Sequence, residues 1–514
     1  MLRRGQARSV LRRRGPHPEV EDVGRWRKLC LAASTGHRAA VRSLFTALRT
    51  ADERGSAEDR KAALDELVRA APRLWLDLDR YARSPHAVTG AHPTDDSGPL
   101  HLVLASFDRD GRIRQAAVER LARRSGRYAA SALALRTDDW VPAVRERAVT
   151  ALLGHVAPDE AAAAVRLLAR LDRRRRAAGV LDAYRMVLSA PERRRTVRRL
   201  AAEPDPHARR FGVELALELG EYVRGDLART ALHDRDQVCR TLCAARLLEL
   251  DPDQAGRLMW ARSAVIRELA VAALPDDVPS ARLVGPLADR SRMVRAQARW
   301  KLYERGEPPV DVYRRQLRRC GRATQPRLVA GLAAGLGECG DSSDLAVLEL
   351  LAADPSWSPV VRRAAVRALG RLGHVSEQVA ALAPLVTDAS PSLAREALDV
   401  LAAGYCAPPK ALAAALARPE PPVWKAALRA ARTLAHWDRL EFTLRAAADP
   451  RPQVAERSRA ELRRWTHAGW SGGAVDPAQL RLVGRLLRQA PLSEPDRIGV
   501  EWVLRAAARV SRPS

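Results

Sequence analysis

The chain has 514 residues, of which 47% are hydrophobic and only 4% aromatic, a composition too apolar for a disordered chain and rich in the helix formers Ala, Leu and Arg. The formal net charge is +27 and is carried almost wholly by arginine, since the only lysines are Lys28, Lys61, Lys301, Lys410 and Lys425. Two interpretations of this charge have equal weight: attraction to a polyanion such as nucleic acid, or the arginine codon preference of a GC-rich genome.

The sequence also excludes a membrane span and a disulfide framework. No stretch approaches 18 uninterrupted apolar residues. The six cysteines are spread along the chain without a Cys-x-x-Cys pair, which is typical of a reducing compartment. Residues 1–24 are basic but lack the apolar segment of a secretory signal. We therefore predict a cytoplasmic protein with a basic, disordered N-terminal arm over residues 1–24.

The region before residue 100 is predicted to contain helices and then a loop. Residues 25–83 have helical character and form an N-terminal helical segment. Residues 84–99, SPHAVTGAHPTDDSGP, are rich in turn formers and poor in apolar residues, which predicts a loop or hinge.

A repeated pattern follows over residues 100–465. Its clearest copy is DPSWSPVVRRAAVRALGRLG, residues 354–373, in which a turn with Asp and Pro precedes an arginine, and a small residue follows three places later. Aligning the copies on that small residue places the arginines at intervals of 27 to 35 residues. The aligned positions are Arg114, Arg145, Arg176, Arg209, Arg240, Arg267, Arg295, Arg327 and Arg362.

Each copy predicts a pair of helices. Asp caps the start of a helix and Pro suits its first turn, so the turn separates two helices. The apolar residues after the turn recur at helical spacing on one face, and a second apolar segment precedes each turn. Because one pair cannot bury both of its apolar faces, the pairs must stack. The predicted fold is an all-α, right-handed solenoid of about eleven to thirteen helix pairs.

The pattern resembles the HEAT family, particularly the short repeats first named from bilin lyases. That resemblance implies a HEAT- or armadillo-like superhelix in which a turn acid and an arginine six residues later form a ladder through the stack. The spacing occurs as Asp108/Arg114, Asp139/Arg145, Glu203/Arg209, Asp234/Arg240 and Asp289/Arg295. Other copies have Ala261, Gly321 or Ser356 in place of the acid, so the ladder is incomplete or these arginines find other acceptors. We interpret the column as structural bracing, because a guanidinium suits repeated bidentate pairing.

Residues 466–514 contain a break with glycines and then two helices, which we predict to be capping helices, because the end of a solenoid needs an atypical unit.

The densest basic segment is residues 171–200. It is a candidate patch for a polyanion or for an acidic protein, and a solvated helix surface explains it equally well. The arginines concerned are Arg173, Arg174, Arg175, Arg176, Arg193, Arg194, Arg195, Arg198 and Arg199.

No catalytic, cofactor or metal site is predicted. Some HEAT-like proteins are DNA glycosylases, and Trp140, Trp300, Trp357 and Trp424 recur near second helices, but we interpret these tryptophans mainly as core residues. The chain contains no His-Glu pair, and the glycines of residues 331–340 lack the spacing of a phosphate loop. The predicted function is therefore a non-catalytic scaffold that binds a protein or peptide along its concave surface. The alternative is a nucleic-acid-binding protein, including a glycosylase-like enzyme.

Overall fold

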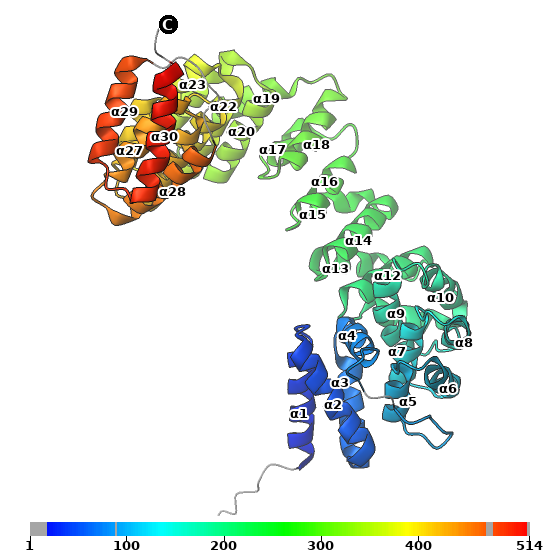
Figure 1. The fold of residues 1–514 in the computed structure, drawn as a ribbon. Helices are drawn as coiled ribbons and strands as arrows, with labels where there is room; N and C mark the ends of the chain where they lie inside the picture. Colours follow the sequence, from blue (N-terminus) through cyan, green and yellow to red (C-terminus); the bar gives the residue numbers. More distant parts are fainter. Residues whose placement is uncertain (1–17, 88–89, 469–475, 511–514) are drawn as a thin grey trace, which may run out of the picture. The chain divides into compact units, whose positions relative to one another are not determined.

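The computed structural model describes residues 18–87, 90–468 and 476–510. The chain divides into two compact units, unit 1 (residues 1–251) and unit 2 (residues 252–514), between which the predicted array is shared (Figure 1). The described residues form α-helices, short 3-10 helices and turns, and contain no β-strand. The predicted all-α fold of stacked helix pairs is confirmed.

Four helices open unit 1. The first, α1, begins inside the predicted arm of residues 1–24, and residues 1–17 lie outside the described ranges. The hydroxyl of Ser56 caps α3 by accepting from the backbone N–H of Asp59, and the Asp59 carboxylate accepts from Trp26 Nε1 at 2.7 Å, which joins α1 to α3. The bounds are α1 (Pro18–Ala33), α2 (Arg38–Arg54), α3 (Ala57–Arg69) and α4 (Pro72–Ala82).

From α5 onward the helices form pairs, in which the odd-numbered helix is the first and the even-numbered helix the second. Second helices begin at the predicted turns: Asp110 and Asp205 accept from backbone N–H groups of α6 and α12, and Pro142 is the first residue of α8. One hydrophobic core runs from Trp26 to Ala216. The bounds in unit 1 are α5 (Pro99–Ser106), α6 (Gly111–Leu121), α7 (Arg127–Arg136), α8 (Pro142–Leu152), α9 (Pro158–Leu171), α10 (Val180–Leu188), η1 (Pro191–Arg193), α11 (Arg194–Ala201), α12 (Pro206–Glu218), α13 (Arg224–His233) and α14 (Gln237–Leu250).

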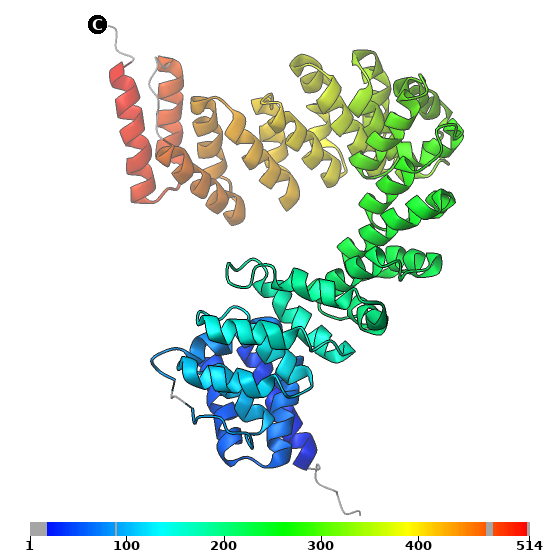
Figure 2. The ribbon, with the colours of Figure 1, turned by 90° about the vertical axis from the view of Figure 1, so that its right-hand side faces the viewer.

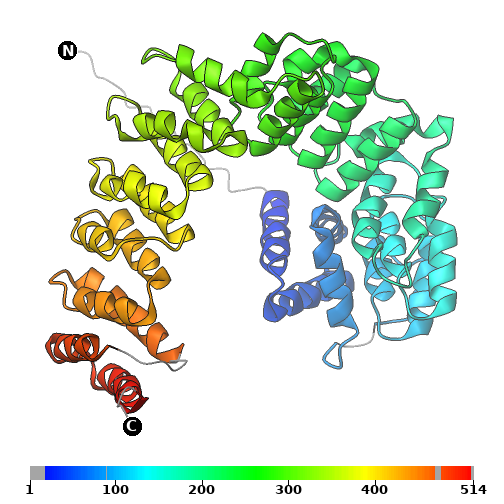
Figure 3. The same ribbon diagram turned by 90° about the horizontal axis from the view of Figure 1, so that it is seen from above.

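Unit 2 continues the same pairing. Its second helices α20, α22, α24 and α26 pack on one another in series (Figure 3). The bounds are η2 (Pro252–Gln254), α15 (Ala255–Leu258), α16 (Ala264–Ala272), α17 (Ser280–Leu287), α18 (Arg292–Tyr303), α19 (Pro309–Arg319), α20 (Pro326–Cys339), η3 (Ser342–Asp344), α21 (Leu345–Ala353), α22 (Pro359–Leu372), α23 (Val375–Leu382), η4 (Pro384–Thr387), α24 (Pro391–Ala403), α25 (Pro409–Leu416), α26 (Pro421–Ala430), η5 (Ala431–Thr433), α27 (His436–Ala447), α28 (Pro452–His467), α29 (Pro477–Gln489) and α30 (Glu494–Val510).

The last pair, α29 and α30, packs on α27 and α28, where the capping helices are predicted (Figure 2). Trp465, Val483 and Val500 are buried in this contact, and Trp465 Nε1 donates to the carbonyl of His436 at 3.0 Å. The apolar residues of the two terminal helices thus cover the end of the preceding pair.

The glycines of α20 permit close helix packing. A Cβ atom on Gly331 would lie 1.8 Å from the carbonyl oxygen of Ala288, and one on Gly337 would lie 2.4 Å from the Cβ of Ala368. Any side chain at these two positions would collide with α17 or its cap and with α22. The glycine-rich stretch is therefore a packing surface inside a helix.

Candidate functional site

The aligned arginines share one structural position. Seven of them are the fourth residue of a second helix: Arg114, Arg145, Arg209, Arg240, Arg267, Arg295 and Arg362. In all of these except Arg362, the guanidinium donates to the backbone carbonyl six residues earlier, at 2.6–2.9 Å. Because every residue has a backbone carbonyl, Ala261 accepts a hydrogen bond from Arg267 just as Asp289 accepts one from Arg295. The acid six residues earlier is therefore bound through its backbone, and not through its carboxylate as the spacing suggested.

The ionic partner of the arginine lies in the next repeat. Arg114 Nε and Nη2 donate to the two carboxylate oxygens of Asp139, both at 2.9 Å. Arg267 holds Asp289 in the same bidentate way at 2.7 and 2.8 Å. Each such carboxylate also accepts from the backbone N–H two residues later and so fixes the start of its own second helix. We call each pair of a ladder arginine and a carboxylate of the next turn a rung. The other rungs join Arg209 to Asp234 and Arg362 to Asp388.

The most deeply buried rung is that of Asp139. Its carboxylate accepts from Arg114, from Arg136 at 3.0 Å and from Arg83 at 3.2 Å, and Arg136 also pairs with Asp79. Burial alone would raise the pKa of Asp139, but the hydrogen bond from Arg114 and the charge of Arg136 outweigh it and hold that pKa below its ordinary value. The network joins α4, α6 and α7. Arg114, Arg136 and Asp139 are buried within it, whereas Arg83 and Asp79 at α4 are partly exposed.

The remaining arginines of the column depart from this scheme. Arg145 has no carboxylate partner among the described residues and keeps only its bond to the carbonyl of Asp139. Arg295 pairs with Glu338 on α20, because the turn before α20 contains no acid. Of the predicted turn acids, Glu203 accepts from Arg199 at 2.7 Å.

Two aligned positions are wrong. Arg176 lies in the turn before α10, whose fourth residue is Ala183. Arg327 is the second residue of α20 and is exposed, and the fourth residue there is Val329. Because the chain is rich in arginine, an arginine lies close to the expected position even when the alignment is shifted. The intervals between arginines alone therefore could not identify the fourth residue of α10 or of α20.

The predicted polyanion patch is divided in two. Arg173–Arg176 are exposed in the turn before α10, whereas Arg193–Arg195, Arg198 and Arg199 follow it, so the nine residues of α10 separate the two groups by about 13 Å. Several of these side chains have acidic partners in the described structure. The pairs are Arg174 with Asp138, Arg194 and Arg198 with Glu221, and Arg199 with Asp159 and Glu203.

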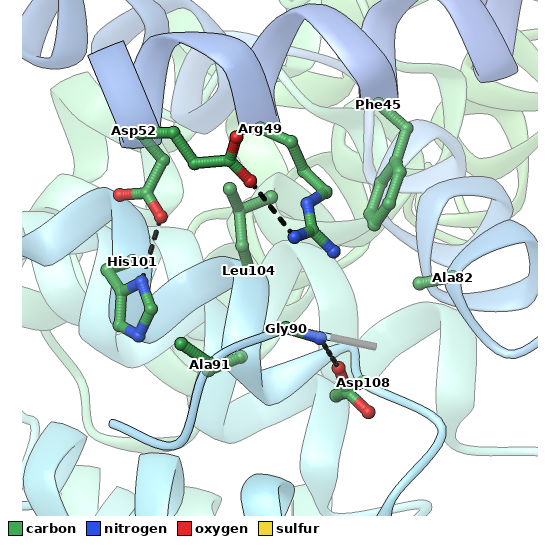
Figure 4. Close-up of a pocket in the computed structure, with 11 residues that line it drawn as sticks. Phe45, Arg49, Asp52, Ala82, Gly90, Ala91, His101, Leu104 and Asp108 are labelled. Carbon is green, nitrogen blue, oxygen red and sulfur yellow. Dashed lines mark hydrogen bonds and ion pairs between the residues drawn. The ribbon is translucent and has the colours of Figure 1, made fainter. Parts of the chain in front are cut away.

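A cavity of about 190 Å³ lies in unit 1, where α2 and α5 meet the segment at Gly90 (Figure 4). On its wall His101 Nδ1 lies 2.8 Å from the Asp52 carboxylate, Arg49 donates to Glu53 at 3.0 Å, and the Gly90 N–H donates to Asp108 at 2.7 Å. The hydrogen bond to Asp52 raises the pKa of His101 in spite of burial. Of these pairs, that of His101 with Asp52 joins α5 to α2.

The outer face of the second helices carries exposed apolar side chains that the sequence interpretation missed. The second residue of the helix is Val238 in α14, Val265 in α16, Met293 in α18 and Val360 in α22, and each is between 37% and 51% exposed. In each of these helices the ladder arginine follows two positions later and points inward. It is largely buried in α16, α18 and α22. Two consecutive apolar residues at the start of a second helix, such as Val360 and Val361, were the available sign in the sequence that one of them is exposed.

The four recurrent tryptophans have different environments. Trp424 is buried, as expected of a core residue, but Trp140 is 57% and Trp300 55% exposed, so the interpretation as core residues is wrong for these two. The guanidinium carbon of Arg114 lies 5.6 Å from the ring centre of Trp140. The guanidinium carbon of Arg322 lies 4.1 Å from the ring centre of Trp357. Two of the tryptophans therefore cover arginines, and Trp300 is the exposed one that lies in the middle of a second helix.

No group of three or more His, Cys, Asp or Glu side chains in the described residues is arranged to hold a metal ion. Cys239 and Cys243 are buried in α14, and this burial raises the pKa of each thiol to about 12. Among the described helices, none combines the length and apolarity needed to cross a membrane.

The chain was compared with known proteins. Residues 321–402 match the family model described as HEAT repeats. No match was found among curated proteins. Solved structures with a similar chain include one of Kap95p binding to RanGDP, at 13% identity, a TM-score of 0.34 and coverage of 98% of this chain and 65% of that one. Another is the karyopherin Kap121p bound to the extreme C-terminus of the protein phosphatase Cdc14p, at 13% identity, a TM-score of 0.31 and coverage of 96% and 54%. UNC-45 from Drosophila melanogaster follows at 12% identity, a TM-score of 0.27 and coverage of 92% and 76%.

The chain thus spans less than two thirds of the length of the first two of these structures. The family match is to HEAT repeats in general, and the bilin-lyase type of repeat stays a prediction.

Proposed function

We propose that this chain, in which residues 321–402 match HEAT repeats, is a non-catalytic scaffold that binds a protein or peptide partner. We assign the predicted concave binding surface to the outer face of the second helices. The observation that carries this proposal is the row of exposed apolar side chains at the second position of these helices. In unit 2 the row consists of Val265, Met293 and Val360.

The core of the repeat is supplied by side chains other than those of the row. Val361, one residue after Val360, is fully buried, and so the helix already contributes an apolar side chain to the core. Exposed apolar side chains that recur at one helical position form contacts that a long partner can use together, each with a small energy. A scaffold that binds through many repeats needs this arrangement.

The ladder supports the proposal by elimination. Arg114, Arg267 and Arg362 are at most 6% exposed and are bound to carboxylates and carbonyls, so they are not available to phosphates or to a partner. The exposed apolar side chains on the outer face of the second helices are, in contrast, available for recognition. The cytoplasmic location stays a prediction.

The test is affinity capture from cells of the source with three full-length proteins. The first is the wild type, the second carries Val265→Glu, Met293→Glu and Val360→Glu, and the third is a matched control. The control carries Leu350→Glu, Val375→Glu and Tyr405→Glu, at exposed apolar positions outside the second helices. We expect a partner that the wild type and the control retain and the row variant loses. A partner retained equally by all three would contradict the proposal.

Nucleic acid is the alternative partner, and the exposed turn with Arg173–Arg176 is the place where it would bind. Titration of short duplex and single-stranded DNA, at low and near-physiological salt, compares the wild type with a variant in which these four arginines are Gln. Binding that persists at physiological salt and weakens in the variant would replace the protein partner with nucleic acid. Binding that disappears with modest salt marks the charge as non-specific.

A further inference from the structure

The helix α18 has two apolar faces, and only one of them is covered. Val294, Ala298 and Leu302 are buried in the core. Met293, Ala296, Trp300 and Tyr303 follow the spacing i, i+3, i+7 and i+10, which places them on one stripe of the opposite face. On this stripe Met293 is 51%, Trp300 55% and Tyr303 70% exposed. Residue 293 to residue 303 spans about 15 Å of helix.

The aromatic end of this stripe is ordered by stacking. The rings of Trp300 and Tyr303 are nearly parallel, at 17°, with centroids 6.4 Å apart. Behind them Arg299 is held by Glu338 of α20 at 2.7 Å, so this guanidinium is occupied and does not cover the rings by folding over them. The two aromatic rings therefore present a preformed apolar platform to solvent.

The neighbouring helix α16 extends the stripe. It packs beside α18, and its residues Val265 and Ala272 occupy the same positions in the helix as Met293 and Trp300. Both of these α16 residues are exposed. We call the set Val265, Ala272, Met293, Ala296, Trp300 and Tyr303 the α18 surface.

One end of the α18 surface is basic. Arg262, Arg290 and Arg292 are exposed at the starts of α16 and α18, and none of them has a carboxylate partner in the described part of the chain. Arg290 donates to the carbonyl of Arg262 at 3.1 Å, so the two turns lie side by side. The helix N-termini add partial positive charge at the same end. The nearby acids are Asp289, which Arg267 holds, Glu268 on α16 and Glu304 at the far end of α18.

We propose that the α18 surface binds a protein segment in which large apolar side chains lie beside two or more carboxylates. This inference rests on the proposed function and gives the chemistry of its partner. The apolar side chains contact Met293, Trp300 and Tyr303. The carboxylates lie near Arg262, Arg290 and Arg292, at the end of the surface about 16 Å of helix from Tyr303. An extended peptide covers that distance in about five residues.

A peptide fits this surface better than a nucleic acid does. Four of the six residues of the surface are not aromatic (Val265, Ala272, Met293 and Ala296), and the stacking platform is a single pair of rings. The arginines are confined to one end and do not follow the surface as a phosphate backbone would require. Charge at one end and apolar area at the other correspond to an acidic segment with apolar anchors.

The experiment is a selection of random dodecapeptides displayed on phage against the full-length chain. The enriched peptides are then synthesised with a fluorophore, and their affinity is measured by anisotropy. The variants are Met293→Glu, Trp300→Ala and the pair Arg262→Gln with Arg292→Gln. The control variant is Trp502→Ala, an exposed tryptophan of α30. Val360→Glu is the comparison variant, which tests another position of the proposed row. Circular dichroism and the melting temperature verify that each variant is folded.

We expect the enriched peptides to combine Asp or Glu with Phe, Trp, Leu or Met. Met293→Glu and Trp300→Ala should each raise the Kd by about tenfold or more, since a desolvated aromatic anchor commonly carries this much binding energy. The double arginine variant should raise the Kd less and flatten its salt dependence. Trp502→Ala should leave the Kd unchanged.

Other results would overturn the inference in distinguishable ways. Enriched peptides that ignore the Met293 and Trp300 variants but are lost in Val360→Glu would remove the α18 surface and leave the proposed function intact. Enriched peptides without carboxylates, unaffected by the arginine variant, would refute the acidic partner. Stronger binding of an oligothymidylate, lost in Trp300→Ala, would assign the surface to nucleic acid. Failure to enrich any peptide would count against both proposals.

Discussion

The second helix α6 of unit 1 and the second helix α16 of unit 2 begin in the same way and differ on their outer faces. In both places a buried arginine near the helix start holds the carboxylate of the next turn, as Arg114 holds Asp139 and Arg267 holds Asp289. At the second helical position, α6 has Arg112, whereas α16 has Val265. The ladder thus specifies the repeat, while the outer position is free to differ, and it is there that recognition can be encoded.

Asp139→Ala should have the largest effect. It removes the acceptor of three arginines and leaves Arg114, which is fully buried, without an ionic partner. Breaking a buried pair on one side costs about 3–5 kcal/mol of unfolding free energy. Urea denaturation measures the loss, and hydrogen exchange should locate it in α6 to α8.

The matched control is Asp138→Ala, which removes only an ion pair to the half-exposed Arg174 and should cost no more than about 1 kcal/mol. Equal losses for the two neighbouring aspartates would mean that burial of the rung contributes nothing.

Asp289→Ala is the corresponding change in unit 2 and should cost less. Asp289 has one arginine partner, Arg267, and part of its carboxylate reaches solvent, so water can replace some of the lost contact. A hydrogen bond to a charged group contributes about 1.5–3 kcal/mol. Hydrogen exchange should confine the change to α16–α18. A loss as large as that of Asp139→Ala would show that Arg83 and Arg136 add nothing to the first rung.

Much of this arrangement could be predicted from the sequence, because turns and helical periodicity are local. The turn acid and the arginine six residues later are both correctly located. The carboxylate of a turn acid such as Asp139, however, bonds to the arginine of the preceding repeat, Arg114. The distance between them, 25 residues for Arg114 and Asp139, varies with loop length and carries no local signal. At α20, Pro326 marks the helix start and would have placed the register better than Arg327 did.

The exposure of Trp300 could not be predicted for a different reason. Helix α18 carries apolar residues on two faces, Val294 and Leu302 on one and Met293 and Trp300 on the other. Periodicity finds both faces but does not indicate which one a neighbouring helix covers. Only the packing of the neighbouring helices settles this.

Acid should weaken the rungs. The pKa values of Asp139, Asp289 and Asp388 are lowered: burial would raise them, but the hydrogen bonds from their arginines outweigh it. An aspartate with a depressed folded-state pKa stabilises the fold above its unfolded-state value, about 3.9, and this stability is lost as the pH falls through the folded-state pKa. We expect the urea midpoint of the wild type to fall below about pH 4.

The Asp139→Asn variant isolates the first rung in the same titration. Having lost that carboxylate, it should start from a lower midpoint and fall less steeply with acid than the wild type. Parallel curves would assign the acid sensitivity to other carboxylates.

Arg145→Ala should have the smallest effect on the free energy of unfolding. It also distinguishes the structural role of the ladder position from the binding role of the outer face. Arg145 occupies the ladder position of α8, and among the described residues its one hydrogen-bond partner is the carbonyl of Asp139, so its removal costs about 0.5–1.5 kcal/mol. The carboxylate of Asp139 keeps its three arginines, and the outer face of α16 and α18 is untouched. We therefore expect a small shift in the urea midpoint and unchanged binding of any peptide selected on the full chain. Loss of peptide binding at an unchanged midpoint would show that the ladder position itself contacts the partner, and the division between a structural ladder and a recognising outer face would fail.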